Sequence, residues 1–290
     1  MVKEDAVMDL YNAIQKRISI RKYGDETFNE GIISQIKQKI MYVKPLYKGI
    51  KVRIELIENP EEANSIGMGF FYGLAKIKAP YSIVAISEVK NGYKENIGFM
   101  QEQLVLELTD MGIGTCWLGT FNGERIRQLL SLGEDEQITN VISLGYPLAG
   151  SFRNNGFRNL LGSSRKKPDE MAYCNNWGES ASMYLSKNPA IKKALDYSIL
   201  APSGGNKQPV YVLFKDSRVL FFVKNKKNGV VINPWSELDA GIFIAHFYLC
   251  CKEQKINTSF FNDPDVNENS KIPEELSYVI SLKFSDGHTL

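Results

Sequence analysis

A long apolar helix that occurs twice constrains the fold of this chain more than any other feature of its sequence. Segment Glu95–Met111 carries apolar residues over too wide an arc for a surface helix, so we expect it to be buried on most sides. Segment Ser236–Ile256 superposes on it with one constant offset, which places Gly241 on Gly98. The chain therefore has to bury the same kind of helix twice.

Two further segments repeat in the same order. The strand-like Asn140–Tyr146 returns as Tyr278–Phe284, and the helix, turn and strand of Ile32–Leu56 return as Ile191–Phe214. One match of this kind can arise by chance, whereas three matches in the same order indicate an internal duplication.

Residues 1–168 and 169–290 are the two expected halves, and the pattern inside them is that of an α+β fold with an antiparallel-dominated sheet in each half. In the first half we expect helices at Val7–Lys16, Asn29–Tyr42, Glu95–Met111 and Glu124–Leu130, and strands at Ile50–Ile57, Tyr81–Ile86 and Val141–Leu144. In the second half we expect helices at Ile191–Leu200 and Leu238–Gln254, and strands at Val210–Phe214 and Tyr278–Phe284.

The composition argues against several classes of protein. At 290 residues and 43% apolar content the chain can bury a large core. Its net charge of +2, without a long block of one sign, predicts no nucleic-acid and no membrane partner. No uncharged apolar run approaches the ~20 residues that span a bilayer, and the acidic residues near the N-terminus do not fit a signal peptide. We therefore expect a cytoplasmic protein.

Cysteine and histidine are too scattered to predict a metal site. The four cysteines show no metal-ligand spacing, and two histidines accompany them. These residues are Cys116, Cys174, Cys250, Cys251, His246 and His288. We interpret the cysteines as buried thiols in a reducing compartment.

A stretch rich in proline and glycine, Ala201–Pro209, joins an expected helix to an expected strand. Pro202 ends the helix, and Ser203–Gly205 lets the backbone approach another group closely, because glycine has no Cβ. The amides of Asn206 and Gln208 both donate and accept hydrogen bonds, which suits the edge of a planar heterocycle. An ordinary helix–turn–strand connection carries the same marks.

A basic segment, Lys16–Tyr23, follows the first expected helix. If it is extended, its alternation puts Arg17, Ser19 and Arg21 on one side and two isoleucines on the other. Two guanidinium groups and a hydroxyl that converge from one face suit a phosphate and an electron-rich ring edge. A solvated basic patch after a helix is the alternative interpretation.

Together these two segments resemble the flavin-binding signatures of the nitroreductase superfamily. Lys16–Tyr23 is similar to the arginine signature of that family, and Ala201–Pro209 to its proline–serine signature. Glu95–Gly119 is similar to the long central helix of the family and the loop that follows it. In the family the two signatures lie within a few dozen residues of each other, whereas here more than 180 residues separate them.

The duplication accounts for this separation. The resemblance implies the intertwined homodimer of the family, in which each subunit supplies one signature to a flavin at the interface. Here the first half has Pro45–Gly49 where the proline–serine signature would fall, and the second half has Ser180–Leu185 where the arginine signature would fall. The chain is therefore similar to a single-chain pseudo-dimer, monomeric in solution, with one composite FMN site.

The resemblance also implies roles for individual residues. Arg17 and Ser19 would hold the FMN phosphate, and Arg21 would reach the N1–C2=O2 edge of the ring. Backbone groups of Leu118 and Gly119 would approach N5. The ring would be lined from the second half by Pro202, Ser203, Gly204, Asn206 and Gln208.

The family also has a basic phosphate clamp before a proline near the end of its domain. Arg165 and Lys166 are the nearest match to that clamp, and we interpret the next residue, Lys167, as a solvated neighbour. Trp117 is interpreted as a packing residue rather than a partner that stacks on the flavin.

The activity implied by the resemblance is that of an FMN-dependent oxidoreductase. NADH or NADPH would reduce the FMN, and a small electron acceptor such as a nitroaromatic or a quinone would then take the electrons in ping-pong order. The flavin rather than a catalytic side chain would carry this chemistry. No Gly-x-Gly-x-x-Gly follows an expected strand, which suits a nicotinamide that visits the flavin only briefly.

Two alternatives stay open. One is a flavin-binding protein without turnover, suggested by the single site and by Leu118, near which the family commonly has an acidic or small residue. The other is a different flavin chemistry on the same fold, such as flavin destruction or reductive dehalogenation.

Overall fold

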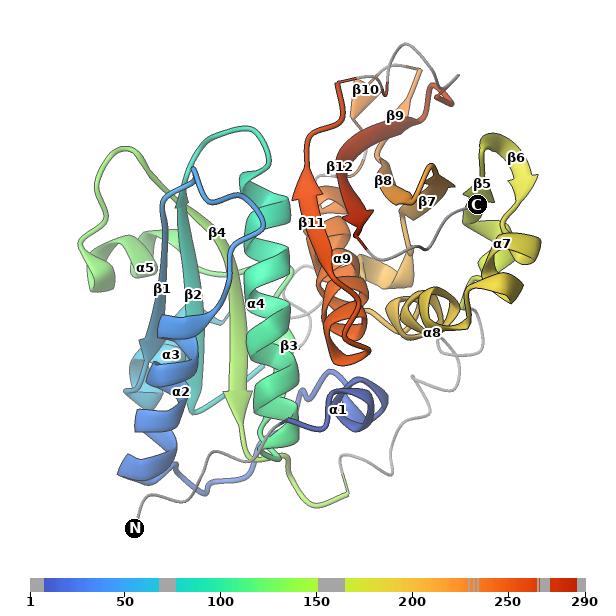
Figure 1. Cartoon of the computed structure of the whole chain (residues 1–290). Helices are drawn as coiled ribbons and strands as arrows, with labels where there is room; N and C mark the ends of the chain where they lie inside the picture. Colours follow the sequence, from blue (N-terminus) through green and yellow to red (C-terminus); the bar gives the residue numbers. More distant parts are fainter. Residues whose placement is uncertain are drawn as a thin grey trace. The chain divides into compact units, whose positions relative to one another are not determined.

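The computed structural model describes residues 8–67, 77–150, 165–228, 230–231, 233, 235–264, 266 and 272–285 (Figure 1). The chain divides into two compact units. The first comprises Met1–Tyr93 and Gln103–Asn159, and the second comprises Lys94–Glu102 and Leu160–Leu290. The N-terminal part of the first long helix therefore belongs to the second unit. Residues 152–164, which precede Arg165 in a basic stretch, lie outside the described residues.

A four-stranded sheet forms the centre of the first unit. The elements of this unit are α1 (Leu10–Lys16), α2 (Glu30–Tyr42), β1 (Val52–Ile57), α3 (Pro60–Ile66), β2 (Tyr81–Glu88), α4 (Tyr93–Asp110), β3 (Gly114–Trp117), α5 (Gly123–Leu130) and β4 (Glu136–Gly145). The strand order is β1-β2-β4-β3, and all neighbours are antiparallel.

The two faces of this sheet bury separate clusters. Ile86 and Val141 pack with residues of α3 and α5 on one face, whereas Ile83 and Ile142 pack with residues of α2 and α4 on the other. Residues of one strand alternate between the two faces, as the two-residue period of a strand requires. Trp117 packs against the second of these clusters, as expected from the sequence.

Asparagine caps fix the beginnings of three helices in this unit. The side chain of Asn29 accepts a hydrogen bond from the Ile32 N–H at 3.0 Å, and that of Asn122 accepts one from the Arg125 N–H at 3.1 Å. Asn59 caps α3 in the same way, directly before Pro60. Each cap satisfies an N–H group that has no partner within its helix.

A six-stranded sheet forms the centre of the second unit. The elements of this unit are β5 (Ala172–Cys174), β6 (Asn176–Ser180), α7 (Ser182–Lys187), α8 (Pro189–Ser198), β7 (Val210–Lys215), β8 (Arg218–Lys224), β9 (Lys226–Lys227), β10 (Val230–Val231), α9 (Ser236–Glu253), β11 (Thr258–Phe261) and β12 (Leu276–Phe284). The order is β11-β12-β8-β7-β5-β6, with β5 parallel to β7 and the other neighbours antiparallel. α9 packs on this sheet, where Phe221 meets Phe243 and Phe247 with ring centroids 6.4 and 5.5 Å apart.

The helices confirm the duplication. α4 and α9 both have 18 residues and are offset by 143 positions (236 minus 93). They also end in the same way: the Ile113 N–H donates to the Leu108 carbonyl at 2.8 Å, and the Ile256 N–H donates to the Cys251 carbonyl at 2.9 Å. The residue before each of these donors has a positive φ, 77° at Gly112 and 58° at Lys255. The α+β fold with two homologous halves is thus confirmed.

The sheets confirm the duplication and correct its register. β1-β2-β4-β3 corresponds to β7-β8-β12-β11, and each of these four-strand sets has one bulge, at Thr139 in β4 and at Val279 in β12. The bulges relate β4 to β12 by 140 positions (279 minus 139), whereas the sequence match Asn140–Tyr146 with Tyr278–Phe284 uses 138 positions. A slip of two residues keeps every side chain on its face, so the apolar pattern cannot detect it.

Two glycines bring helices into close contact inside the second unit. A Cβ on Gly98 would collide with the Leu238 carbonyl oxygen, and a Cβ on Gly241 would collide with the Glu95 carbonyl oxygen. Under the offset of 143 positions these two contacts are the same contact made twice. Such reciprocity is the mark of an isologous interface, the kind found between subunits related by a twofold axis.

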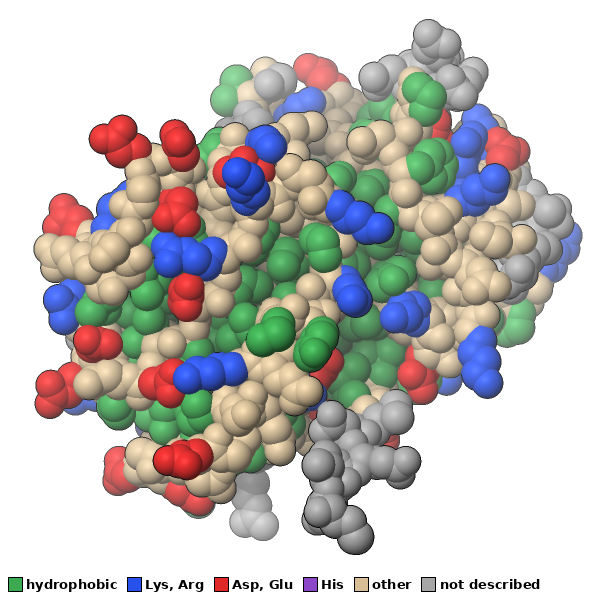
Figure 2. Space-filling view, turned by 60° about the vertical axis from the view of Figure 1, so that its left-hand side comes forward, with side chains coloured by type: hydrophobic (Ala, Val, Ile, Leu, Met, Phe, Trp, Pro, Cys, Tyr) green, Lys and Arg blue, Asp and Glu red, His purple; other side chains and the backbone are tan. Residues whose placement is uncertain are grey.

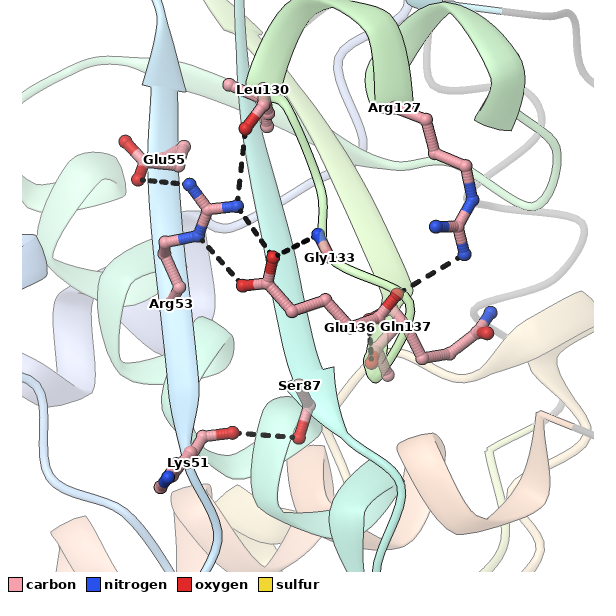
Figure 3. A network of polar contacts seen from close by, with 10 residues as sticks. Lys51, Arg53, Glu55, Ser87, Arg127, Leu130, Gly133, Glu136 and Gln137 are labelled. Carbon is pink, nitrogen blue, oxygen red and sulfur yellow. Dashed lines mark hydrogen bonds and ion pairs between the residues drawn. The ribbon is translucent and has the colours of Figure 1, made fainter.

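The ion pair between Arg53 and Glu136 in the first unit stabilises the turn before β4. In Figure 3 the Arg53 guanidinium donates to both carboxylate oxygens of Glu136 at 3.2 Å, and Glu136 also accepts from the Gly133 N–H at 3.0 Å. The Gly133 N–H and the Arg53 charge lower the pKa of Glu136. The pair is about one-third exposed, so it contributes little to the free energy of unfolding.

The face shown in Figure 2 carries side chains of both signs, with acidic ones more frequent at the left of the view and basic ones more frequent at the right. Among the described residues, none of the helices combines the length and the apolar character needed to cross a membrane.

Candidate functional site

The arginine segment, residues 17–21, runs beside the edge strand of the first sheet. Ser19 forms a parallel bridge with Thr115 of β3, and the Ile20 N–H donates to the Thr115 carbonyl at 2.8 Å. Ile18 and Ile20 are buried at 9% and 2% exposure. The segment is therefore extended, and the predicted alternation of polar and apolar side chains is confirmed.

The polar side of this segment lies near the buried thiol of Cys116 on β3. Burial raises the pKa of this thiol, while the charges of Arg21 and Arg17 and a hydrogen bond with Ser19 lower it. All three predicted side chains of the first signature thus lie in the neighbourhood of Cys116. The guanidinium of Arg21 also donates to the Ser19 carbonyl at 3.3 Å. The fold brings together two cations and a hydroxyl, the groups that bind phosphate.

A tyrosine anchors the end of the segment. The Tyr23 hydroxyl donates to the Ser143 carbonyl at 3.1 Å, 3.0 Å from the Ser143 hydroxyl, and burial raises the pKa of Tyr23 well above its usual value. The Gly24 N–H donates to the Tyr146 carbonyl at 3.0 Å. The segment is therefore tied to both β3 and the end of β4.

Leu118 and Gly119 differ in what they can offer a ligand. Leu118 is 5% exposed, packs in the core, and donates its N–H to the Val141 carbonyl at 3.0 Å. Gly119 is exposed, and nothing lies within 4 Å of where its Cβ would be. Of the two predicted backbone donors near N5, the Leu118 N–H is therefore committed to the sheet.

The proline–serine loop, residues 201–209, has an unusual backbone. Gly205, Asn206 and Gln208 all have positive φ, at 59°, 57° and 47°. A non-glycine residue in this region costs about 1 kcal/mol or more, so its surroundings must hold it there. One restraint lies within the loop, where the Gln208 N–H donates to the Ser203 hydroxyl oxygen at 2.9 Å.

Arg165 binds the backbone where α8 leads into this loop. Its guanidinium donates to the carbonyls of Ile199 at 3.1 Å, Leu200 at 3.2 Å and Ala201 at 2.6 Å. These carbonyls lie just beyond the end of α8, outside its hydrogen-bond ladder. The structure thus places Arg165 on the backbone that leads into the loop.

Lys166 holds the other end of the loop. Its backbone N–H donates to the Gln208 side-chain oxygen, and its ammonium donates to the Gln208 carbonyl, both at 2.9 Å. The ammonium also donates to the Tyr211 hydroxyl at 3.0 Å. Lys167 is exposed. The basic pair predicted to clamp a phosphate therefore lies on the second signature.

Asp239 completes the loop and was not identified from the sequence. It is 5% exposed, and its two carboxylate oxygens accept from the Gly204 N–H at 3.0 and 3.1 Å. Burial raises its pKa to about 7, while the Gly204 N–H and Lys207 oppose this shift. One signal was available: Asp239 is an acid in the first turn of α9, at the place that Asn96 occupies in α4.

Each signature occurs in one half of the described chain. In the first unit, 13 residues, 17–29, separate α1 from α2 and include the arginine segment. In the second unit, Asn188 alone separates α7 from α8. Conversely, residues 43–51 of the first unit connect α2 to β1 without the proline–serine sequence. The two signatures therefore lie in different units.

Comparisons with known proteins agree with this fold. A family model described as "Putative TM nitroreductase" matches residues 9–251. The crystal structure of a "putative nitroreductase" from Thermotoga maritima covers 99% of this chain and 98% of its own, at 20% identity and a TM-score of 0.60. This match extends over both halves.

Two further relatives match about half of the chain. A protein of Methanothermobacter thermautotrophicus named "Putative NADH dehydrogenase/NAD(P)H nitroreductase" is 27% identical over 167 residues, which are 54% of this chain and 85% of that protein. A nitroreductase with bound FMN from Bacteroides fragilis is 16% identical, covering 50% of this chain and 91% of its own with a TM-score of 0.41.

Proposed function

The chain belongs to the nitroreductase family whose model spans residues 9–251, and on that premise we propose that it is an FMN-dependent oxidoreductase. NADH or NADPH would be the reductant, and a small molecule such as a nitroaromatic or a quinone would be the acceptor. The single observation that supports this most is the extended arginine segment beside β3, which buries Ile18 and Ile20 and leaves Arg17, Ser19 and Arg21 on the other side. The names of the relatives support the oxidoreductase class.

The donor set of the arginine segment fits FMN. A phosphate dianion is bound best by charged donors. Arg17 provides such a donor, and the Ser19 hydroxyl adds an uncharged one. Arg21 is exposed, so its guanidinium can extend to the N1–C2=O2 edge of the ring, where positive charge favours the reduced cofactor. The exposed Gly119 is the backbone group proposed to approach N5.

The proline–serine loop would bind the flavin ring from its own side. Gly204 and Gly205 are exposed, and nothing lies within 4 Å of where a Cβ of Gly205 would be. This open backbone permits a flat ligand to approach closely. Pro202, Ser203, Asn206 and Gln208 complete the proposed lining, and Arg165 and Lys166 would fix its shape.

When bound, FMN supplies the hydride and electron transfer, and the protein orients it and admits each partner in turn. We propose one FMN per chain, because each half carries one signature. We also propose that the chain is a monomer, since the duplication supplies both copies of the helix that forms the isologous contact.

The test is the absorption spectrum of the purified protein with added FMN, before and after NADH or NADPH. We expect a bound flavin spectrum that is bleached by one of the two nucleotides. Arg17→Ala should lose most of the bound flavin, whereas Arg127→Ala, which removes a surface guanidinium far from the segment in sequence, should keep it. A wild-type protein that binds no FMN would contradict the proposal.

A second candidate function is flavin binding without turnover. It is favoured by the Leu118 N–H, which the Val141 carbonyl occupies at 3.0 Å. The same experiment separates the two, because a passive binder would hold FMN that neither nucleotide bleaches. Other flavin chemistry, such as flavin destruction or dehalogenation, would instead appear as loss of the flavin itself or as release of halide.

A further inference from the structure

We infer that Asp239 is a positioning residue whose carboxylate fixes the backbone of Gly204. The affinity of the proline–serine loop for its ligand therefore depends on whether Asp239 is ionised. The contact itself is independent of the proposed function. The identity of the ligand, FMN, rests on that function.

The contact is placed where the loop most needs support. The Gly204 N–H faces both oxygens of Asp239, at 3.0 and 3.1 Å, from the residue directly before the strained Gly205 and Asn206. Two other restraints reach the loop from outside it, through Arg165 at Ala201 and Lys166 at Gln208. Within the loop, the Gln208 N–H donates to the Ser203 hydroxyl and the Gln208 side chain donates to the Asn206 carbonyl at 3.2 Å. Asp239 thus restrains the start of the glycine turn from another element, α9.

The surroundings of Asp239 move its ionisation into the neutral pH range. It lines a pocket with Met171, Ser198, Ser203 and Phe243, among other residues that do not titrate. Among the described residues Lys207 is the cation that acts on it, and Lys207 is exposed. Burial therefore dominates and raises the pKa of Asp239 to about 7.

The two protonation states differ as acceptors. An ionised carboxylate presents two acceptor oxygens to the Gly204 N–H, and both oxygens of Asp239 lie within reach of it, at 3.0 and 3.1 Å. A protonated carboxyl has a hydroxyl in place of one of them, and this hydroxyl must itself find an acceptor. Protonation therefore weakens the restraint on Gly204 and frees a backbone that has to hold residues at positive φ.

The duplication provides an internal comparison. The half without the proline–serine loop has an amide, Asn96, at the position of Asp239, 143 places earlier. The carboxyl thus occurs in the half that has the loop. An acid in the first turn of a helix also stabilises the helix by itself, so the experiment must report on Gly204 and not only on stability.

The first measurement follows the backbone amide of Gly204 by NMR, in the full-length protein labelled with ¹⁵N-glycine and without added flavin. We expect its resonance to titrate near neutral pH in the wild type and to stay fixed in Asp239→Asn. Glu95→Gln is the matched control, because Glu95 is a partly buried acid whose pKa is also raised to about 7, chiefly by burial, but which lies on α4. A Gly204 resonance that does not titrate in the wild type would overturn the inference.

The second measurement titrates FMN into the same proteins at pH 6 and pH 8, by the quenching of FMN fluorescence. If the ionised form is the one that binds, Kd should rise about tenfold from pH 8 to pH 6, as the ionised fraction falls. Asp239→Asn should remove this pH dependence, Asp239→Ala should bind weakly at both pH values, and Glu95→Gln should match the wild type. The same dependence on pH in the wild type and in Asp239→Asn would overturn the inference.

The two measurements also separate this inference from the proposed function. A Gly204 resonance that titrates with Asp239, in a protein that binds no FMN at either pH, would support the contact and contradict the proposed cofactor. A protein that binds FMN but whose Gly204 resonance does not depend on Asp239 would support the proposed cofactor and contradict the inferred contact.

Discussion

Two carboxyl groups of the second unit, Asp239 and Glu95, are held where ionisation costs free energy. Burial is the largest cause for both, and it raises each pKa to about 7 from ordinary values of 3.8 and 4.5. For Glu95 the negative charge of Glu237 adds to the shift. Groups of this kind destabilise a protein at neutral and alkaline pH, in contrast to carboxylates in ion pairs.

We predict that the free energy of unfolding falls between pH 5 and pH 8 because of these two groups. Between the unfolded and folded pKa values the folded protein keeps protons that the unfolded chain has lost, so stability is highest below about pH 4 for each group and is lost as the pH rises through 7. Asp239→Asn and Glu95→Gln should each raise the free energy of unfolding at pH 8 by on the order of 1–3 kcal/mol. Urea unfolding across this pH range measures it, and variants that stay parallel to the wild type would contradict it.

Arg21 is predicted to act on the flavin and not on the fold. It is exposed, so Arg21→Ala should leave the free energy of unfolding nearly unchanged while FMN affinity falls about tenfold, the scale of one charged hydrogen bond. Lys22→Ala, an exposed neighbour on the other side of the segment, should bind FMN as the wild type does. An unchanged flavin affinity and midpoint potential in Arg21→Ala would remove Arg21 from the site.

At the scale of residues the sequence predicts which side of a segment is polar, but not what a polar side chain reaches. The alternation of Ile18 and Ile20 with Arg17, Ser19 and Arg21 follows from the period of a strand and is confirmed. The partners of Arg165 lie 34 to 36 residues along the chain. Such contacts depend on the tertiary fold, which is why the sequence does not predict that the basic pair Arg165 and Lys166 binds the loop.

At the scale of elements the helix contact of the second unit depends on two glycines. A Cβ at Gly241 would collide with the carbonyl of Glu95, and backbone atoms cannot move aside as side chains do. We predict that Gly241→Ala lowers the free energy of unfolding by about 2–4 kcal/mol, and that Gly98→Ala lowers it by a similar amount, since its contact is the repeat of the same one.

Gly49→Ala is the control for this prediction, because nothing lies within 4 Å of the new methyl group. It should be close to neutral. Thermal and urea unfolding of the three variants decide the matter, and a Gly241→Ala protein as stable as Gly49→Ala would show that the close approach of these helices is not needed.

Elements with a strong period or a cap could be predicted from the sequence, while their exact pairing could not. From Asn122 before α5 and from the alternation in β1, the bounds of those two elements were predicted to within two residues. The match between β4 and β12 was offset by two positions, because the similar sequences Val141–Leu144 and Val279–Leu282 outweighed the bulges, which leave no apolar signal of their own. Asp239 could not be identified from the sequence either, because an acid in the first turn of a helix is common and gives no sign of a functional role.

At the scale of the whole molecule, duplication lets equivalent positions diverge. Lys94 and Glu237 occupy the same place in α4 and α9, and their side chains form an ion pair at 2.7 Å. In an exact homodimer this residue would face its own copy with the same charge. The fused chain has one residue of each sign, just as it has one of each signature, and such differences make the two halves complementary rather than identical.

The central claim, one FMN site in a duplicated chain, is tested most directly by counting flavin. A second FMN would need an arginine signature in the second half, and the start of α7 has no guanidinium to offset a phosphate dianion. Burying that charge unpaired would cost several kcal/mol. Flavin released by denaturation from the FMN-saturated protein, divided by the protein concentration, gives the number. We predict one FMN per chain; a ratio that approaches two, or one that stays near zero, would contradict the account.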